Sequence, residues 1–72
     1  MTEQDFITKM QEDVLDTEEE LTMDMALDDI EEWDSLSFVS FVAMAKLETG
    51  KKVDRKSVAA AETVRDLYAL LQ

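Results

Sequence analysis

The 72-residue chain contains no cysteine, no histidine and no proline, and it has a single glycine. Without cysteine, no disulfide can stabilise the fold and no thiolate can bind a metal. A chain without cysteine suits a reducing compartment, so we expect a cytoplasmic protein. No apolar run approaches the roughly 18 residues that span a bilayer. The N-terminal ten residues lack the basic and apolar regions of a secretory signal, and we expect no membrane insertion.

Composition favours one small folded domain over a disordered chain. The hydrophobic fraction is 46%, which is high for a disordered protein even at a net charge of −11. A chain of this length holds one domain at most, so we expect residues 1–72 to form a single domain. Such a domain buries a modest core, and we expect it to be a monomer.

The negative charge lies almost entirely in the first half of the chain. Residues 1–34 hold fourteen acids and one base, Lys9, whereas residues 35–72 hold four acids and six bases. The two halves therefore carry −13 and +2. An acidic surface repels nucleic acid and anionic membranes and attracts proteins with basic patches. We expect protein partners and no nucleic acid.

Two segments have apolar residues at helical spacing and a capping pair at their start. The first, residues 3–14, follows the pair Thr2 and Asp5. The last, the segment ETVRDLYALL, includes the pair Thr63 and Asp66. The apolar positions of these two predicted helices are Phe6, Ile7, Met10 and Val14, and Val64, Leu67, Tyr68 and Leu71.

Residues 15–33 predict a long ordered loop. The alternating apolar residues 21, 23, 25 and 27 resemble a strand, but a lone strand in a helical chain has no partner. Loops of this length are uncommon and tend to be functional, and we expect its apolar residues to hold it against the helices. The segment from Asp24 to Asp29 lacks the glycine and the ligand spacing of a calcium loop, so we expect no metal site.

A second long helix is predicted over residues 35–49, and a short one over 54–60. Asp34 or Ser35 can cap the start of the long helix, Gly50 can end it, and Asp54 can cap the short one. The prediction is an all-α, small four-helix bundle with a long loop between helices 1 and 2.

The helix over residues 35–49 has more apolar residues than one buried face needs. Two stripes are offset around it: Phe38, Phe41, Val42 and Ala45, and then Leu36, Val39, Ala43 and Leu47. One stripe faces the core. The other is either covered by the long loop or free to meet a partner, and the sequence leaves both alternatives open.

Ser35 is the candidate reactive residue. A serine hydroxyl needs an adjacent base to act as a nucleophile, and Lys46, eleven residues along the same helix, is too far away. We therefore expect no enzymatic activity. A hydroxyl at a helix N-terminus is well placed to be modified with a phosphate-type group by another enzyme. The alternative is that Ser35 only caps the helix.

The tripeptide Asp34-Ser35-Leu36, at the start of the second helix of this plan, resembles the DSL signature of acyl carrier proteins. The resemblance covers nearly the whole chain and implies a four-helix bundle of acyl-carrier type. It implies that Ser35 carries a 4′-phosphopantetheine arm, which a phosphopantetheinyl transferase takes from coenzyme A. Asp34 would orient that reaction near the transferase's magnesium ion. Leu36, Val39 and Ala43 would meet partner enzymes.

Acidic residues in this chain lie upstream of the second helix, whereas typical fatty-acid carriers keep acids along it. We therefore expect partners to contact the loop acids as well as the stripe that contains Leu36. These acids are Asp28, Asp29, Glu31 and Glu32, with Asp34 next to them. Whether Phe38 and Phe41 line or fill an acyl cavity is left open.

Three functions remain as hypotheses. The first is an acyl carrier protein for a specialised lipid, fatty acid or polyketide pathway, served by acyl-activating ligases, synthases or acyltransferases. The second is an aminoacyl carrier, because the segment EWDSL also resembles D-alanyl carrier proteins. The third is an acidic helical adaptor without a cofactor.

Overall fold

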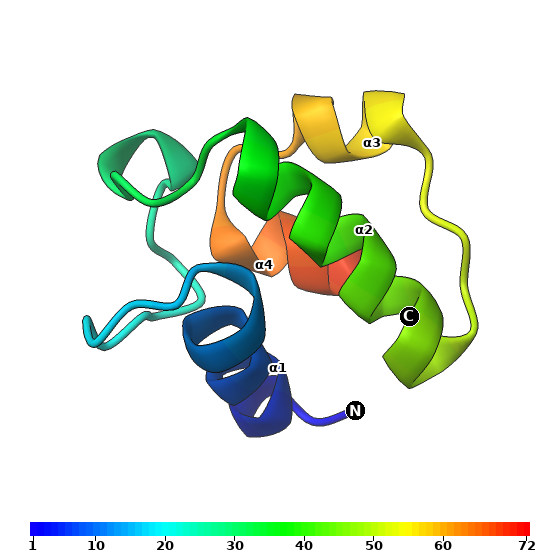
Figure 1. Ribbon diagram of the computed structural model, residues 1–72, viewed down its shortest axis with the longest axis horizontal. Helices are drawn as coiled ribbons and strands as arrows, with labels where there is room; N and C mark the ends of the chain where they lie inside the picture. The colour runs from blue at the N-terminus through cyan, green and yellow to red at the C-terminus, as the bar shows by residue number, and fades with distance from the viewer.

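The computed structural model describes residues 1–72 as a helical protein without β-strands (Figure 1). Its α-helices are α1 (Glu3–Lys9), α2 (Ser35–Thr49), α3 (Arg55–Ala60) and α4 (Val64–Ala69). A π-helical segment, Met10–Val14, continues α1, and a short 3₁₀ turn, Leu27–Asp29, interrupts the long loop. The expected all-α class with four helices is therefore confirmed. None of these helices has the length and apolar character of a membrane span.

The first predicted helix, residues 3–14, is present but changes its winding at Met10. The amide of Leu15 donates to the carbonyl of Met10 at 2.8 Å, a five-residue step that is wider than an α-helical one. Asp16 then adopts φ 51°, in the left-handed region that ends helices. The predicted cap is confirmed, because the Thr2 hydroxyl accepts from the amide of Asp5 at 3.1 Å.

One core joins α1, α2 and α4, with α3 packed at its edge. The Phe6 ring meets the edge of Phe41, with centroids 6.3 Å apart, and the ring of Tyr68 at 5.3 Å. Such edge-to-face pairs are favourable beyond the area they bury. The largest fully buried side chains are Phe6, Phe41, Met10, Leu67, Val58 and Val64.

The long loop is held against the start of α4 by backbone hydrogen bonds. The amide of Leu27 donates to Glu62 O at 2.9 Å, and that of Arg65 donates to Met23 O at 2.8 Å. A single antiparallel bridge joins Ala26 to Thr63. The alternating apolar pattern thus belongs to a loop in which Leu21, Met23 and Leu27 are buried, although Met23 and Asp24 form a turn and Leu27 begins the 3₁₀ turn. The prediction of a loop in place of a strand is confirmed, and one isolated bridge is the β-type contact that the segment makes.

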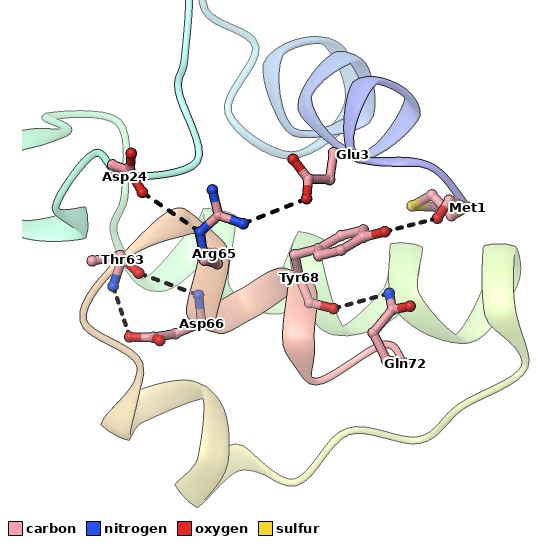
Figure 2. A network of polar contacts seen from close by, with 8 residues as sticks. All are labelled: Met1, Glu3, Asp24, Thr63, Arg65, Asp66, Tyr68 and Gln72. Carbon is pink, nitrogen blue, oxygen red and sulfur yellow. Dashed lines mark hydrogen bonds and ion pairs between the residues drawn. The ribbon is translucent and has the colours of Figure 1, made fainter.

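Side chains also tie the loop and the two ends of the chain together (Figure 2). Arg65 lies 3.4 Å from a Glu3 carboxylate oxygen and 3.5 Å from one of Asp24, so it links α4 to α1 and to the loop. The Tyr68 hydroxyl donates to the carbonyl of Met1 at 3.1 Å. These contacts leave α2 and α3 to form the opposite part of the molecule, where the candidate site lies (Figure 1).

Candidate functional site

The N-terminus of α2 is capped by Asp34. Its Oδ1 accepts from the amides of Leu36 and Ser37, both at 3.0 Å, and the Ser37 hydroxyl accepts from the Asp34 amide at 2.7 Å. These bonds, that from the Ser37 amide above all, hold the pKa of Asp34 below its ordinary value. All of the side-chain bonds of Asp34 end on Oδ1, so its Oδ2 remains unengaged.

Ser35 occupies the first position of α2 and takes no part in this cap. It is exposed, and its hydroxyl forms no hydrogen bond to any other group of the chain. Of the two cap residues that the sequence allowed, the structure therefore selects Asp34. The interpretation of Ser35 as a helix cap was wrong, because it is Asp34 that accepts from the amides of Leu36 and Ser37.

A groove between α2 and α3 begins at Ser35, and we call it the α2–α3 groove. Its near part has a volume of about 560 Å³ and brings two cations of α3, Arg55 and Lys56, to the same depression as Ser35. The other residues that line this near part are Trp33, Asp34, Phe38, Val39 and Ala59. No hydrogen bond joins the Ser35 hydroxyl to Arg55 or Lys56, and neither acts on it as a base in this arrangement.

The groove continues along α2 into a far part of about 580 Å³. Phe38, Val39 and Arg55 line both parts, so the two depressions adjoin along α2. The far part adds Val42, Ala43, Lys46 and Leu47. In Figure 1, α3 lies over the N-terminal half of α2, and the connection after Gly50 swings away from the rest of the molecule.

The two phenylalanines of α2 have separate roles. Phe41 is fully buried and fills the core, whereas Phe38 is half-buried and lines the groove. Trp33 packs against both, with ring centroids 6.2 Å from Phe38 and 6.3 Å from Phe41. The last residue before the cap is thereby anchored, and this fixes the start of α2 relative to the core.

The second apolar stripe of α2 is not covered by the long loop. Leu36, Val39 and Leu47 are 79%, 55% and 85% exposed, and Ala43 is exposed as well. Of the two alternatives that the sequence left open, the structure shows the free stripe. Exposed large apolar side chains gathered on one helix mark a surface suited to a ligand or a partner.

The upstream acids are divided between solvent and structure. Asp28 and Asp29 lie in the exposed 3₁₀ turn, and Glu31 is also exposed. Glu32 is half-buried and accepts from the Thr17 hydroxyl at 2.9 Å, so it fixes the loop onto itself. Three of these four predicted partner contacts are therefore freely accessible.

Two bases of the chain form ion pairs, whereas the three bases that line the groove form none. Lys9 pairs with Glu48 at 2.9 Å and with Asp13 at 3.4 Å, and its hydrogen bond to Glu48 raises its pKa. Arg65 is paired as described above. By contrast, the three bases that line the α2–α3 groove form no ion pair, although the chain has eighteen acids: Lys46, Arg55 and Lys56.

Comparison with protein-family models, curated proteins and solved structures finds no match to this chain. Of the residues predicted for the site, Ser35, Asp34 and Val39 line the near part of the groove and Ala43 lines the far part. Leu36 lines neither part. Arg55 and Lys56 were missed from sequence. The sequence shows the excess of bases after Ser35, but it does not show which helix lies beside that serine.

Proposed function

We propose that this chain is an acyl carrier protein whose Ser35 bears a 4′-phosphopantetheine arm. The observation that carries the proposal is an exposed serine at the first turn of α2 that has no structural duty, because Asp34 caps the helix. A free hydroxyl there is accessible to a modifying enzyme, and the helix N-terminus favours the phosphodiester that results. The DSL tripeptide and the order of the helices point to the same family.

The residues around Ser35 suit such an arm. Arg55 and Lys56 line the groove beside the serine and offer positive charge to a phosphodiester. The unengaged Oδ2 of Asp34 is available to the magnesium ion of a transferase, and its lowered pKa keeps this carboxylate charged at neutral pH. When bound, the arm supplies the thiol that this cysteine-free chain lacks, and that thiol carries the cargo as a thioester.

The attachment reaction needs no base from this chain. The Ser35 oxygen forms a bond to the phosphorus of coenzyme A that carries the pantetheine, while the bond from that phosphorus to adenosine 3′,5′-bisphosphate breaks. The hydroxyl proton passes to the transferase. The carrier then presents its thioester to acyl-activating ligases, synthases or acyltransferases, and tethering raises the local concentration of the cargo at a docked enzyme.

The test is intact mass after incubation with coenzyme A, magnesium and a broad-specificity phosphopantetheinyl transferase. We expect one addition of the phosphopantetheine mass to the natural chain and to Ser40→Ala, and none to Ser35→Ala. Ser40 lies on the same helix and controls for the loss of a hydroxyl. No addition to the natural chain, with the transferase active on an established carrier, would contradict the proposal and favour the acidic adaptor.

A further inference from the structure

We propose that the far part of the α2–α3 groove receives the distal end of the cargo, and that Lys46 and Arg55 select acyl groups that end in a carboxylate. This proposal rests on the proposed function, because the cargo reaches the groove through the arm on Ser35. It names a substrate class that the apolar residues of α2 do not by themselves indicate. Three features of the groove support it: its length, its lining and its charge.

The length of the groove matches the reach of the arm. Lys46 lies eleven residues after Ser35 on the same helix, or about 16 Å along its axis at 1.5 Å per residue. About fourteen bonds separate the Ser35 oxygen from the sulfur of the arm, as many as in roughly five extended peptide residues, or about 17 Å. The arm can therefore bring its sulfur over the far part of the groove, and it has to bend by about the length of the cargo for the distal end of a short acyl group to lie beside Lys46.

The lining of the far part suits the methylene groups of a short cargo. Phe38, Val39, Val42 and Ala43 provide apolar surface on α2, and Leu47 extends it at the far end. Leu47 is 85% exposed, so this surface has apolar area to cover. An acyl group laid there covers part of it without any displacement of the core, since Phe41 stays fully buried beneath α2.

The charge of the far part favours an anion at the end of that cargo. Lys46 and Arg55 line it from opposite helices, and it contains no acidic residue. Neither base has an ion pair, although the chain carries a net charge of −11. Two unpaired cations over an apolar floor attract a carboxylate and repel the ammonium group of an aminoacyl cargo. The groove thus favours the acyl carrier over the aminoacyl carrier.

The test compares two five-carbon cargoes that differ in one end group. The transferase is supplied with glutaryl-coenzyme A or with pentanoyl-coenzyme A, and intact mass verifies a single loading of the ¹⁵N-labelled chain. Amide chemical shifts of each loaded form are then compared with those of the chain bearing the free arm. We expect the glutaryl form to show at least about twofold larger shifts than the pentanoyl form at Val39 to Leu47 and at Arg55. About 1 M salt should remove this excess, because the screening length falls to about 3 Å.

Variants connect the excess shifts to the two cations. Lys46→Ala combined with Arg55→Ala should abolish the difference between glutaryl and pentanoyl forms. Lys52→Ala should preserve it, because Lys52 is exposed and does not line the groove. All three positions are exposed, so none of these changes removes a buried contact of the fold.

Equal shift patterns for the two cargoes, or an excess that survives in the double variant, would overturn the cargo proposal. The cations would then be assigned to an acidic surface of a partner enzyme. A chain that takes up no arm would instead overturn the proposed function, and with it this inference. Intact mass distinguishes that failure from a loaded chain whose groove does not respond.

Discussion

At the scale of single residues, Asp34 caps α2 and Ser35 keeps a free hydroxyl. The sequence alone allows either residue to be the cap. Asp34 accepts two amides at the start of α2, whereas the neighbouring hydroxyl of Ser35 stays free. If Ser35 were the cap, its hydroxyl would accept a hydrogen bond from the helix and would not be free. The second cap contact, from Ser37, makes the arrangement independent of Ser35.

Replacement of the two residues should therefore affect stability differently. Asp34→Ala removes the acceptor of two amides and should lower the melting temperature by about 4–8 °C at neutral pH, the effect of a lost cap in a domain of this size. Ser35→Ala should change it by less than about 2 °C, since no bond is lost. Thermal unfolding followed by circular dichroism measures both. A Ser35→Ala variant as unstable as Asp34→Ala would show that Ser35 contributes to the cap.

The contribution of Asp34 to stability should depend on pH with a definite sign. Hydrogen bonds to the ionised carboxylate lower the pKa of Asp34 in the folded state, so its contribution is present above the unfolded pKa of about 3.9. That contribution is lost as the pH falls through the lower, folded pKa. The gap in melting temperature between the natural chain and Asp34→Ala should therefore narrow below pH ~4. An unchanged gap under acid conditions would contradict this assignment.

At the scale of elements, α2 is the helix with the most exposed large apolar side chains. One side contributes Phe41, Met44 and Ala45 to the core, and the opposite side leaves Leu36 and Leu47 exposed. A helix that is apolar on most sides is normally buried or paired with a partner. The exposed side of α2 is thus an apolar surface suited to a ligand or a partner.

The end of α2 depends on the backbone of Gly50. This residue adopts φ 75°, a left-handed conformation that costs other residues about 1–2 kcal/mol. A Cβ at this position would meet no atom within 4 Å, so the effect of a substitution is purely a backbone effect. Gly50→Ala should lower the free energy of unfolding by about 1–2 kcal/mol, and Gly50→Asn by less, because asparagine tolerates this conformation.

Urea unfolding of the two Gly50 variants checks this prediction. Equal losses for alanine and asparagine would mean that the cost is not set by the left-handed backbone. Neither substitution touches the α2–α3 groove, since Gly50 lies outside its lining. Under the proposed function, both variants should accordingly accept the arm on Ser35 to the same extent as the natural chain, which intact mass measures.

At the scale of the whole molecule, charge is separated between two regions. The acids of residues 1–34 other than Asp34 lie on α1, on its π-helical continuation and on the long loop, whereas three bases without an ion pair line the α2–α3 groove. The protein therefore offers two surfaces of opposite charge to its surroundings. Its loop acids are suited to basic partner surfaces, and its groove is suited to anions.

This excess of like charge should make stability sensitive to salt. At a net charge of −11, self-repulsion opposes the compact state, and the four exposed ion-pair contacts compensate for little of it. We expect the melting temperature to rise between about 0.01 M and about 0.15 M sodium chloride, where the screening length falls from about 30 to about 8 Å. Calorimetry measures this, and a flat or falling profile would contradict it.

The sequence determined the helices, because each is encoded by local signals. Thr2, Asp54 and Thr63 cap the helices that were expected after them, and Gly50 ends α2 as expected. These features depend on hydrogen bonds over a few residues, which spacing along the chain reveals. The change to π-helical winding at Met10 was not predicted, because none of these local signals marks it.

The surroundings of Ser35 depend on tertiary contacts. The sequence could name the serine, but two alternatives for its role and two for the second apolar stripe remained. Contacts between distant segments decided the alternatives for the stripe, because the loop packs on α4 and leaves the stripe free, and they also place Arg55 of α3 beside α2. The cap was decided locally by Asp34, and the modification of Ser35 stays a proposal. Such contacts depend on how helices pack in three dimensions. Local residue spacing does not encode that packing.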